Sequence, residues 1–516
     1  MSLIISQAHK AIVAPPTSGV LNLFPTFPRL RDGKVVIPHG QRETLLLRHM
    51  GYQVPSPLMY YDWPGNKRPY KVQVATVHDM VDNPRFYNLN GMGTGKTRCV
   101  LWWWDFLNRG GLVGKLLVVA PLSTLSLVWA KEAFATLPGR TVQVLHGTRS
   151  QRLQALAADA DIYVINHDGL RTIVEALAKR SDITALALDE LAVYRNNSDR
   201  SKMMRKFAQR FQAIVGLTGT PMPNEPTDVW GQAKIITPHT VPMHQRGARE
   251  LLMFQVSQYI WRPKPDAIIN AFKMLRPSCR YSLDDVIELP PLINRSVDVE
   301  LSKEQIETYN RVRLHMVAAI QNKQIEALNA GAMLNKLVQI GGGWVYTKRP
   351  EFVALDSKTR VQALIDLITS ADHKVLVAIP YRHMIEGISE IFNSTAVGID
   401  HCVVHGDVTK VNRDHIFNLF QQTDKYRVML AHPETVHHGL TLTAADTVIW
   451  YVPIASLDVY QQFNARITRI GQKHKQQVIR MCGTPTEKKL YALLDGKDTR
   501  QQTLLELLEE ATGEAI

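Results

Sequence analysis

Short apolar runs alternate with longer segments of helical periodicity along most of the chain. In the first half the runs are RFYNLN, KLLVVAP, DIYVIN, ALALDE and AIVGLTGT, and in the second they are HKVLVAIP, HCVVHG, YRVMLAH, DTVIWYVP and QVIRMCG. Runs that are continuously apolar rather than alternating are typical of parallel strands covered by helices on both faces. The pattern therefore predicts an α/β fold with two parallel sheets in tandem.

The length and the pattern together predict a division into domains. A chain of 516 residues is too long for one ordinary hydrophobic core. We expect a small, Pro-rich N-terminal accessory module over 1–68 and a first α/β lobe over 69–236. A mainly helical insertion or linker region is expected over 237–355. The second lobe then covers 356–516 and ends in the amphipathic helix TLLELLEEA.

Composition narrows the class of protein. The four cysteines form no CxxC pair, which argues against a zinc site or a disulfide framework and favours a reducing compartment. There is no signal-peptide pattern at the start, and the most apolar run, LLVVAPLSTLSLVWA, is short for a membrane span. We expect a cytoplasmic monomer. It would be associated with the nucleoid or, if the protein is viral, lie in the cytoplasm of the host. The net charge of +13 favours a polyanionic partner, with nucleic acid as the first candidate.

A Gly-rich turn lies between a predicted strand and a predicted helix in FYNLNGMGTGKTRCVLWWW. Backbone N–H groups at a helix N-terminus bind phosphate, and glycines allow the close approach. Lys96 is expected to reach the β- and γ-phosphates of ATP, and the Thr97 hydroxyl to ligate Mg²⁺. The strict GxxxxGK[ST] pattern fails at its first position, where Asn90 stands, so a turn without a ligand is the alternative. The candidate nucleotide-binding residues of the turn are Gly93, Thr94, Gly95, Lys96 and Thr97.

An acidic pair ends the apolar run ITALALDE. Ligands bind at the carboxyl ends of strands in open α/β sheets, so Asp189 is a candidate Mg²⁺ ligand and Glu190 a candidate activator of the attacking water. The alternative is a solvated strand end, which is the usual interpretation of an isolated Asp-Glu pair. The phosphate loop upstream favours the catalytic interpretation.

Three further segments carry a family resemblance. LTGTPMPNEPTDVW, LTAADTVIWYVP and QFNARITRIGQKHK resemble the third, fifth and sixth motifs of superfamily-two helicases, in the form found in Swi/Snf-type DNA translocases. The similarity spans about residues 68–485, in order, and is that of a compact relative of the phage or bacterial branch-remodelling kind. It implies two RecA-like lobes with ATP bound by the first lobe.

The resemblance also implies roles for individual residues. Gln73 matches the glutamine that reads adenine, and Arg466 and Arg469 match the arginines that the second lobe presents to the γ-phosphate. An arginine finger contributes roughly 10³–10⁵ in rate, and placing it on another lobe makes hydrolysis conditional on closure. A basic helix face is the alternative for the two arginines. The residues implied in coupling hydrolysis to movement, or in holding that surface, are Thr218, Thr220, Gln462 and Gly439.

Small polar residues at predicted strand ends are candidates for contacts with the DNA backbone, which is read without regard to sequence. His437 and His438 stand where the family has small residues, so we assign them no contact with DNA. A metal site is disfavoured because the sequence offers no third ligand beside these two histidines. Ordinary loop residues are the alternative at each position. The candidate nucleic-acid contacts are Ser123, Thr124, Asn166, His167, His405, Gly406 and Thr441.

Several features remain open at the level of sequence. Ala192 replaces the family's polar residue after the acidic pair, which predicts an active ATPase with altered coupling. Three consecutive tryptophans in LWWWDFLNRG cannot share one helix face, so one is expected to be partly exposed, and packing beneath the N-terminal module is favoured over base stacking. The N-terminal module itself is either a reader of DNA structure or a packing extension.

The sequence as a whole predicts an ATP-dependent DNA translocase or helicase. Its expected cofactors are ATP and Mg²⁺, and its expected partner is double-stranded or branched DNA, which it would remodel in DNA repair or replication. The alternatives are an RNA-directed helicase and a nucleotide-gated DNA-binding switch with weak hydrolysis.

Overall fold

The computed structural model divides the chain into two compact units, Met1–Val286 and Ile287–Ile516. The residues described are 3–257, 261–286, 290–321, 327–347, 351–394, 396–436, 441–469 and 471–495. The predicted helix TLLELLEEA and the predicted site residue Gly439 lie outside them. None of the described helices is both long and apolar enough to cross a membrane.

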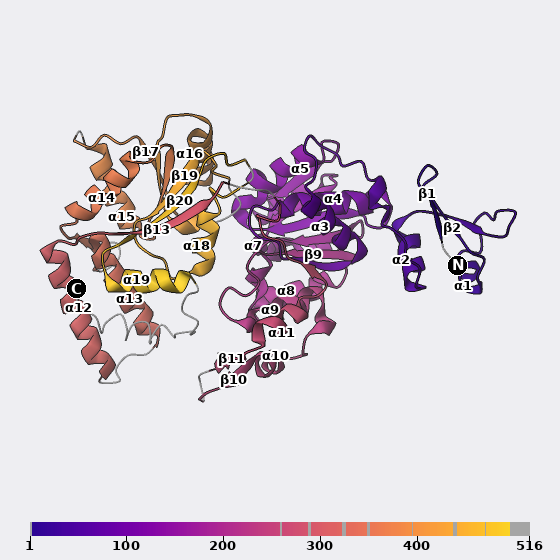
Figure 1. Ribbon diagram of the computed structural model, residues 1–516, viewed down its shortest axis with the longest axis horizontal. Helices are drawn as coiled ribbons and strands as arrows, with labels where there is room; N and C mark the ends of the chain where they lie inside the picture. The colour runs from indigo at the N-terminus through magenta and orange to yellow at the C-terminus, as the bar shows by residue number, and fades with distance from the viewer. Residues whose placement is uncertain are drawn as a thin grey trace. The chain divides into compact units, whose positions relative to one another are not determined.

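The N-terminal part of the first unit is a small antiparallel sheet with two helices, shown in indigo in Figure 1. Its elements are β1 (Ile4–Ser6), β2 (Ala11–Ala14), α1 (Ser18–Leu23), β3 (Val35–Pro38) and α2 (Gln41–His49). They enclose a hydrophobic cluster of their own. Polar contacts join α2 to the lobe that follows: Gln41 Nε2 donates to the Val81 carbonyl at 3.2 Å and to Asp82 Oδ1 at 3.0 Å, and Arg48 pairs with Asp82 at 2.6 Å.

The larger part of the first unit is a seven-stranded parallel sheet in the order β12-β4-β9-β8-β5-β7-β6. Its strands are β4 (Arg85–Asn88), β5 (Lys115–Ala120), β6 (Val142–Leu145), β7 (Ile162–Asn166), β8 (Ile183–Leu188), β9 (Ala213–Leu217) and β12 (Ser278–Cys279). Its helices are α3 (Lys71–Asp82), α4 (Lys96–Arg109), α5 (Lys131–Thr136), α6 (Arg149–Ala157), α7 (His167–Ala178), α8 (Asp199–Ala208), α9 (Val229–Ile236), α10 (Gln245–Leu252) and α11 (Ala267–Met274). A short hairpin, β10 (Met253–Gln255) with β11 (Trp261–Pro263), follows α10.

Helices cover both faces of this sheet, as its continuously apolar strands predict (Figure 1). In β5, Leu117 and Val119 join the hydrophobic cluster that includes α7, α8 and α9. Leu116 and Val118 face the opposite way and join the cluster that includes α3, α4 and α5.

The three tryptophans of α4 are all fully buried, so the prediction that one is partly exposed is wrong. Trp103 donates to the Met80 carbonyl of α3 at 3.0 Å, which places it between two helices. Trp102 packs edge-to-face on Trp63, with 5.2 Å between ring centroids. Because the segment before α3 covers the outer side of α4, this helix has no solvent-facing stripe. The predicted packing beneath the N-terminal segment is confirmed at Trp102.

The second unit contains a six-stranded parallel sheet in the order β13-β20-β19-β16-β18-β17. Its strands are β13 (Leu292–Asp298), β16 (Lys374–Ala378), β17 (His401–Val404), β18 (Val428–Ala431), β19 (Ala445–Trp450) and β20 (Gln476–Cys482), and a separate hairpin pairs β14 (Trp344–Tyr346) with β15 (Phe352–Ala354). Its helices are α12 (Lys303–Gln321), α13 (Ala327–Gly342), α14 (Lys358–Thr369), α15 (Arg382–Asn393), α16 (Lys410–Gln422), α17 (Pro433–Val436), α18 (Leu457–Asn464) and α19 (Pro485–Leu494). Hydrophobic clusters again lie on both faces of the sheet.

The region 237–355 contains α10, α11, α12 and α13, and it also supplies a strand to each sheet, which its sequence pattern does not indicate. β12 pairs with β4 in the first sheet, and β13 pairs with β20 in the second. β12 has two residues, too few to leave a sequence pattern. β13 is an edge strand with mostly exposed side chains, so it lacks the continuous apolar run of an inner strand.

Candidate functional site

Most of the candidate residues of the first unit lie at one edge of its sheet. Because the strands are parallel, the segments at their carboxyl ends meet there. Those segments are the Gly-rich turn 89–95 after β4, residues 123–124 after β5, residues 166–167 at the end of β7, residues 189–190 after β8 and residues 218–220 after β9. The sequence pattern predicts a strand end at each of them.

The Gly-rich turn has the backbone that a phosphate loop requires. Gly93 and Gly95 adopt φ of 78° and 84°, in the left-handed region that favours glycine, and α4 begins immediately after Gly95. The Lys96 ammonium donates to the carbonyls of Asn90 at 2.8 Å and Gly91 at 2.9 Å. It is therefore held against the mouth of the loop, beside the helix N-terminus that would face a phosphate.

Asn90, which stands where the strict pattern has glycine, is a buried link between three segments. Its Nδ2 donates to Thr76 Oγ1 of α3 at 2.9 Å, and its Oδ1 accepts from the Tyr281 backbone N–H at 2.9 Å. Tyr281 follows β12, so Asn90 joins the phosphate loop to the edge strand of the sheet. A glycine could not make these bonds, which gives the departure from the pattern a structural reason.

Gln73, the predicted adenine reader, is buried against the same loop. Its Nε2 donates to the Thr94 carbonyl at 2.9 Å, and its Oε1 accepts from the Tyr70 backbone N–H at 3.1 Å. A Cβ added at Gly95 would come within 2.4 Å of Gln73 Nε2. The side chain thus holds the loop in this structure, and its contact with adenine stays a prediction.

The acidic pair lies at the end of β8. Trp129 Nε1 donates to Asp189 Oδ2 at 2.9 Å, and the Glu190 backbone N–H donates to Asp189 Oδ1 at 3.1 Å. Desolvation raises the pKa of Asp189, while Trp129 and the charge of Lys96 act in the opposite direction. Glu190 has φ of 51°, one of two non-glycine residues with positive φ in the described chain. Backbone strain of this kind is concentrated at functional sites.

The segment 218–220 lies against the phosphate loop. A Cβ added at Gly219 would be 3.7 Å from both Lys96 Nζ and the Asn90 carbonyl oxygen. Thr218 is buried, and its Oγ1 accepts from the Thr220 backbone N–H at 3.2 Å. The third motif and the phosphate loop are therefore neighbours at the same sheet edge.

The predicted nucleic-acid contacts of the first unit have side chains largely occupied within the protein. Thr124 Oγ1 donates to the Pro121 carbonyl at 2.9 Å, and Asn166 Oδ1 accepts from Arg152 at 2.9 Å. Ser123 Oγ is buried and has no hydrogen-bond partner in the described part of the chain. Their contact with DNA stays a prediction.

His167 is 6% exposed and shares a hydrogen bond of 2.9 Å between its Nδ1 and the Tyr194 hydroxyl. Burial lowers the pKa of His167 to about 4, with the charge of Arg200 acting in the same direction and the backbone of Asp189 opposing it. The ring is neutral at physiological pH, so an ionic contact between His167 and phosphate is disfavoured.

In the second unit, the two predicted arginines lie just after α18. Arg466 is buried and its Nε donates to the Gln462 carbonyl at 2.7 Å, one helical turn earlier. Arg469 donates to Thr441 Oγ1 at 3.3 Å. Desolvation lowers the pKa of Arg469 to about 10, so the guanidinium stays charged at neutral pH. The structure therefore brings the segment of Arg466 and Arg469 into contact with the segment of Thr441.

His405 and Gly406 follow β17 at the carboxyl edge of the second sheet. Burial, together with the charge of Arg382, lowers the pKa of His405. A Cβ at Gly406 would meet nothing within 4 Å, so this position borders open space. Their predicted DNA contacts stay predictions.

Comparison of the sequence with known protein families identifies the two sheets. Residues 89–341 match the SNF2-related domain, and residues 359–471 match the Helicase conserved C-terminal domain. The chain belongs to the SNF2-related family of helicases. The resemblance found in its motifs is thereby confirmed, and the two parallel sheets are the two RecA-like lobes of an ATP-hydrolysing, helicase-type enzyme.

The relatives of this SNF2-family chain include phage, bacterial and plant proteins. It is 26% identical to protein p41 of Acyrthosiphon pisum secondary endosymbiont phage 1, over 80% of this chain and 89% of that protein. It is 24% identical to the ATP-dependent helicase MG018 of Mycoplasma genitalium and to the ATP-dependent DNA helicase DDM1 of Arabidopsis thaliana. The match covers 77% and 76% of this chain but only 38% and 55% of those two proteins. A solved structure, the Sulfolobus solfataricus SWI2/SNF2 ATPase core in complex with dsDNA, aligns with a TM-score of 0.40 at 19% identity, covering 90% of this chain and 96% of that one.

Trp129 is a residue of the SNF2-family site that the sequence reasoning missed. A buried indole N–H generally finds an acceptor, and here the acceptor is the carboxylate of Asp189. The only signal in the sequence is its place six and five residues after Ser123 and Thr124, in the segment already chosen as a DNA contact. The chemistry of the neighbouring carboxylate could not be read from that spacing.

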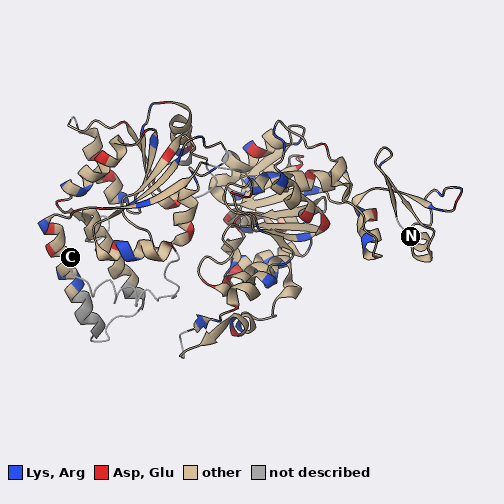
Figure 2. Cartoon of the chain, viewed as in Figure 1, with Lys and Arg blue, Asp and Glu red and all other residues tan. Residues whose placement is uncertain are grey.

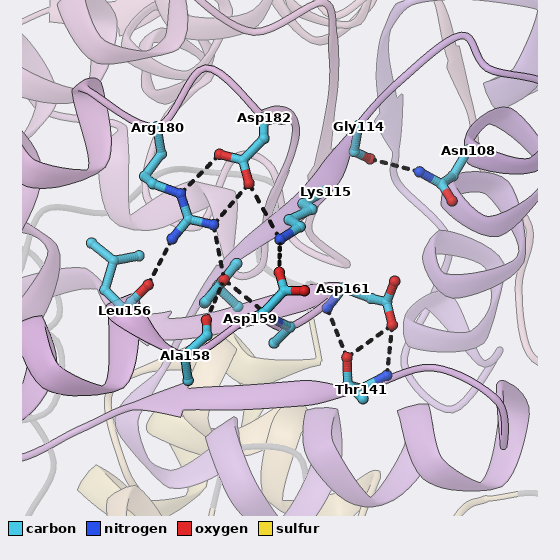
Figure 3. A network of polar contacts seen from close by, with 12 residues as sticks. Asn108, Gly114, Lys115, Thr141, Leu156, Ala158, Asp159, Asp161, Arg180 and Asp182 are labelled. Atoms are coloured by element: carbon cyan, nitrogen blue, oxygen red, sulfur yellow. Dashed lines mark hydrogen bonds and ion pairs between the residues drawn. The ribbon is translucent and has the colours of Figure 1, made fainter.

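The opposite edge of the first sheet carries a different polar network (Figure 3). Lys115 pairs with Asp159 and, at 3.3 Å, with Asp182, and Arg180 pairs with Asp182 at 2.8 Å. The ion pair with Arg180 holds the pKa of Asp182 far below its usual range. These residues fasten the amino ends of β5, β7 and β8, so we assign them a structural role.

Proposed function

We propose that the chain is a DNA-stimulated ATPase that moves along DNA and remodels branched DNA by annealing, fork reversal or branch migration. The observation that carries this proposal is the meeting of Lys96, Asp189 and the segment 218–220 at one sheet edge. That arrangement joins a phosphate-binding loop, an acidic pair and the coupling motif of the family.

The side chains present fit ATP and Mg²⁺. The Thr97 hydroxyl and the Asp189 carboxylate are oxygen ligands of the kind that Mg²⁺ prefers, and desolvation of Asp189 favours a nearby cation. When bound, the metal ion neutralises charge on the β- and γ-phosphates. Glu190, held at the strand end, would orient the attacking water, and Arg466 and Arg469 would add positive charge at the γ-phosphate.

Nucleic acid is the partner favoured by charge. The chain carries a net charge of +13, and Figure 2 shows Lys and Arg distributed over both units among Asp and Glu. A motor that steps along DNA contacts phosphates without reading bases, so small polar groups at strand ends suit the track. We propose Ser123, Thr124 and the β7–α7 junction at Asn166 and His167 in the first unit, and His405, Gly406 and Thr441 in the second, as such contacts.

The decisive experiment measures the ATPase rate of the whole chain with single-stranded, duplex and forked DNA and with RNA. Wild type should be stimulated most by duplex or forked DNA, and Lys96→Ala and Arg469→Ala should each lose the stimulated rate. Stronger stimulation by RNA would support an RNA-directed helicase. Equally low turnover of wild type and Glu190→Gln with DNA present would support a nucleotide-gated switch instead. Unaffected hydrolysis in Lys96→Ala and Arg469→Ala would overturn the site.

The N-terminal module is the proposed reader of branched DNA. Lys10 and Arg31 are exposed on its turns and Arg29 is exposed at an isolated bridge to Val35, where all three are available to phosphates. Deleting the module would remove the contacts of Arg48 with Asp82 and of Trp63 with Trp102, so point variants are the sharper test. Charge reversal of Arg29 and Arg31 should weaken fork binding at least about tenfold relative to duplex binding, with the ATPase rate on duplex as the internal control. Equal affinity of wild type and variant for forks would show that the module does not read branched DNA through these arginines.

A further inference from the structure

The turn that follows the acidic pair is fastened to the start of α7. Residues Leu191–Tyr194 form a short 3-10 helix, and the Tyr194 side chain is fully buried. Its hydroxyl lies 2.9 Å from His167 Nδ1, and the two rings pack edge-to-face with centroids 5.4 Å apart. A single residue pair thus links the catalytic strand end, two residues past Ala192, to the end of β7.

His167 occupies a position between track and catalysis. It is the first residue of α7, directly after Asn166, at the sheet edge proposed to face DNA. Its second ring nitrogen, Nε2, is buried and has no partner at hydrogen-bond geometry within the described residues, although the backbone of Asp189 lies near enough to raise the pKa of the ring. A buried polar atom without a hydrogen-bond partner is energetically costly. A small shift of α7 would therefore change the surroundings of His167 Nε2 and the energy of this arrangement.

The same turn is in contact with the third motif through α9. Gly231 of α9 lies so close to the turn that a Cβ there would be 2.2 Å from the Tyr194 carbonyl oxygen. The next residue, Gln232, donates from Nε2 to the Pro221 carbonyl at 2.6 Å, and Pro221 directly follows Thr220. A displacement of Tyr194 would therefore act on both the acidic pair and the coupling motif.

We infer that Tyr194 and His167 are positioning residues that transmit the DNA-bound state of the β7–α7 junction to the catalytic pair, in place of the polar side chain absent at Ala192. This inference rests on the proposed function, because it assumes that DNA stimulates hydrolysis. DNA bound at the junction fixes the position of the start of α7. The hydrogen bond between His167 and Tyr194 then fixes the position of the Tyr194 ring, and Tyr194 fixes the conformation of the turn that follows Asp189 and Glu190.

The test is Tyr194→Phe, which removes one hydroxyl and keeps the ring. Basal ATPase without DNA should be unchanged, and the DNA concentration that gives half-maximal stimulation should also be unchanged. The rate at saturating DNA should fall about fivefold, at the lower end of the usual coupling between two sites. A purely structural role would not separate these three quantities.

Tyr163→Phe is the matched control. Tyr163 is also fully buried in the first unit, and its hydroxyl donates to the Ala158 carbonyl at 2.7 Å and accepts from Arg180 at 3.0 Å. Ala158 and Arg180 belong to the network at the opposite sheet edge shown in Figure 3. This variant also loses one buried tyrosine hydroxyl, but it should keep the full DNA stimulation.

The outcomes separate this inference from the proposed function. If DNA stimulates wild type and Tyr194→Phe equally, the inference is overturned and the proposed function stands. A parallel fall of basal and stimulated rates in Tyr194→Phe, or an equal loss of stimulation in Tyr163→Phe, also overturns the inference. A wild type without any stimulation by DNA overturns both.

Discussion

The most sharply defined energetic feature of the second unit is the buried ion pair between Arg360 and Glu487. Both side chains are 0% exposed, and the closest N–O distance is 2.7 Å. Arg360 comes from α14 and also donates to the carbonyls of Gly341, Tyr451 and Met481. Glu487→Gln keeps the shape of the side chain but removes the negative charge.

The expected loss of stability follows from the charge of Arg360, which the variant leaves buried. In the variant, the Arg360 guanidinium stays buried with carbonyl acceptors but no counter-charge. Removing one partner of a buried pair costs about 3–5 kcal/mol. For a unit of this size, that corresponds to a fall of about 6–20 °C in the melting temperature. Gly483 and Thr484 both donate a backbone N–H bond to Glu487 Oε2, and a neutral amide oxygen in that place can still accept them, so the lower part of the range is expected.

Differential scanning calorimetry of the whole chain would measure this, because the two units should give separate transitions. The control is Glu386→Gln in the same unit, where Arg382 and Glu386 pair at 2.7 Å with side chains 51% and 42% exposed. Exposed pairs contribute about 0–1 kcal/mol, so its melting temperature should hardly change. Equal shifts in the two variants would refute the argument that burial determines the cost.

Two predictions concern the nucleotide site. Gly95→Ala should abolish binding of a fluorescent ATP analogue, because its Cβ would displace Gln73 and its φ of 84° is strained for alanine, whereas Gly111→Ala, at φ of 68° with open space around it, should bind normally. Trp129→Phe should move the acidic limb of the ATPase pH profile upward by about one unit, since removing a hydrogen bond to a charged group raises the already raised pKa of Asp189 further.

Each of these has an outcome that would contradict it. Equal nucleotide affinity of Gly95→Ala and Gly111→Ala would show that the close approach to Gln73 has no role. For the pH profile, the control is Trp104→Phe, which removes an indole bond of 2.9 Å to the Gly114 carbonyl in the same lobe. A shift of the same size in both tryptophan variants would remove Asp189 as the cause.

The inner strands of both sheets could be predicted from the sequence because each is buried on both faces. A strand such as β5, KLLVVA, must be apolar at every inner position when helices cover both sides, and that run is visible without a structure. The strand-end residues follow from the same rule, since parallel strands bring their carboxyl ends to one edge. The placement of Lys96 and Asp189 at that edge could therefore be predicted from the sequence, and their roles stay predictions.

Other features could not be predicted because their causes lie in distant parts of the chain. Burial of Trp102 depends on Trp63 and Pro64, which come well before α4 in the sequence and cover its outer side. β13 is an edge strand, and its exposed side chains resemble a loop. The role of Asn90 depends on Tyr281, which no local pattern connects to the phosphate loop.

Ala192 shows how a departure from a family pattern is best interpreted. From the sequence, the absence of a polar side chain at Ala192 predicts an active ATPase with altered coupling. In the structure, the same turn is fixed by Tyr194 to His167 on one side and by Gly231 of α9 on the other. Both Tyr194 and Gly231 are buried, and α9 itself is hydrogen-bonded to the third motif through Gln232. A turn that lacks one polar side chain stays coupled when packing holds the positions beside it, so altered coupling here means a different route rather than a missing one.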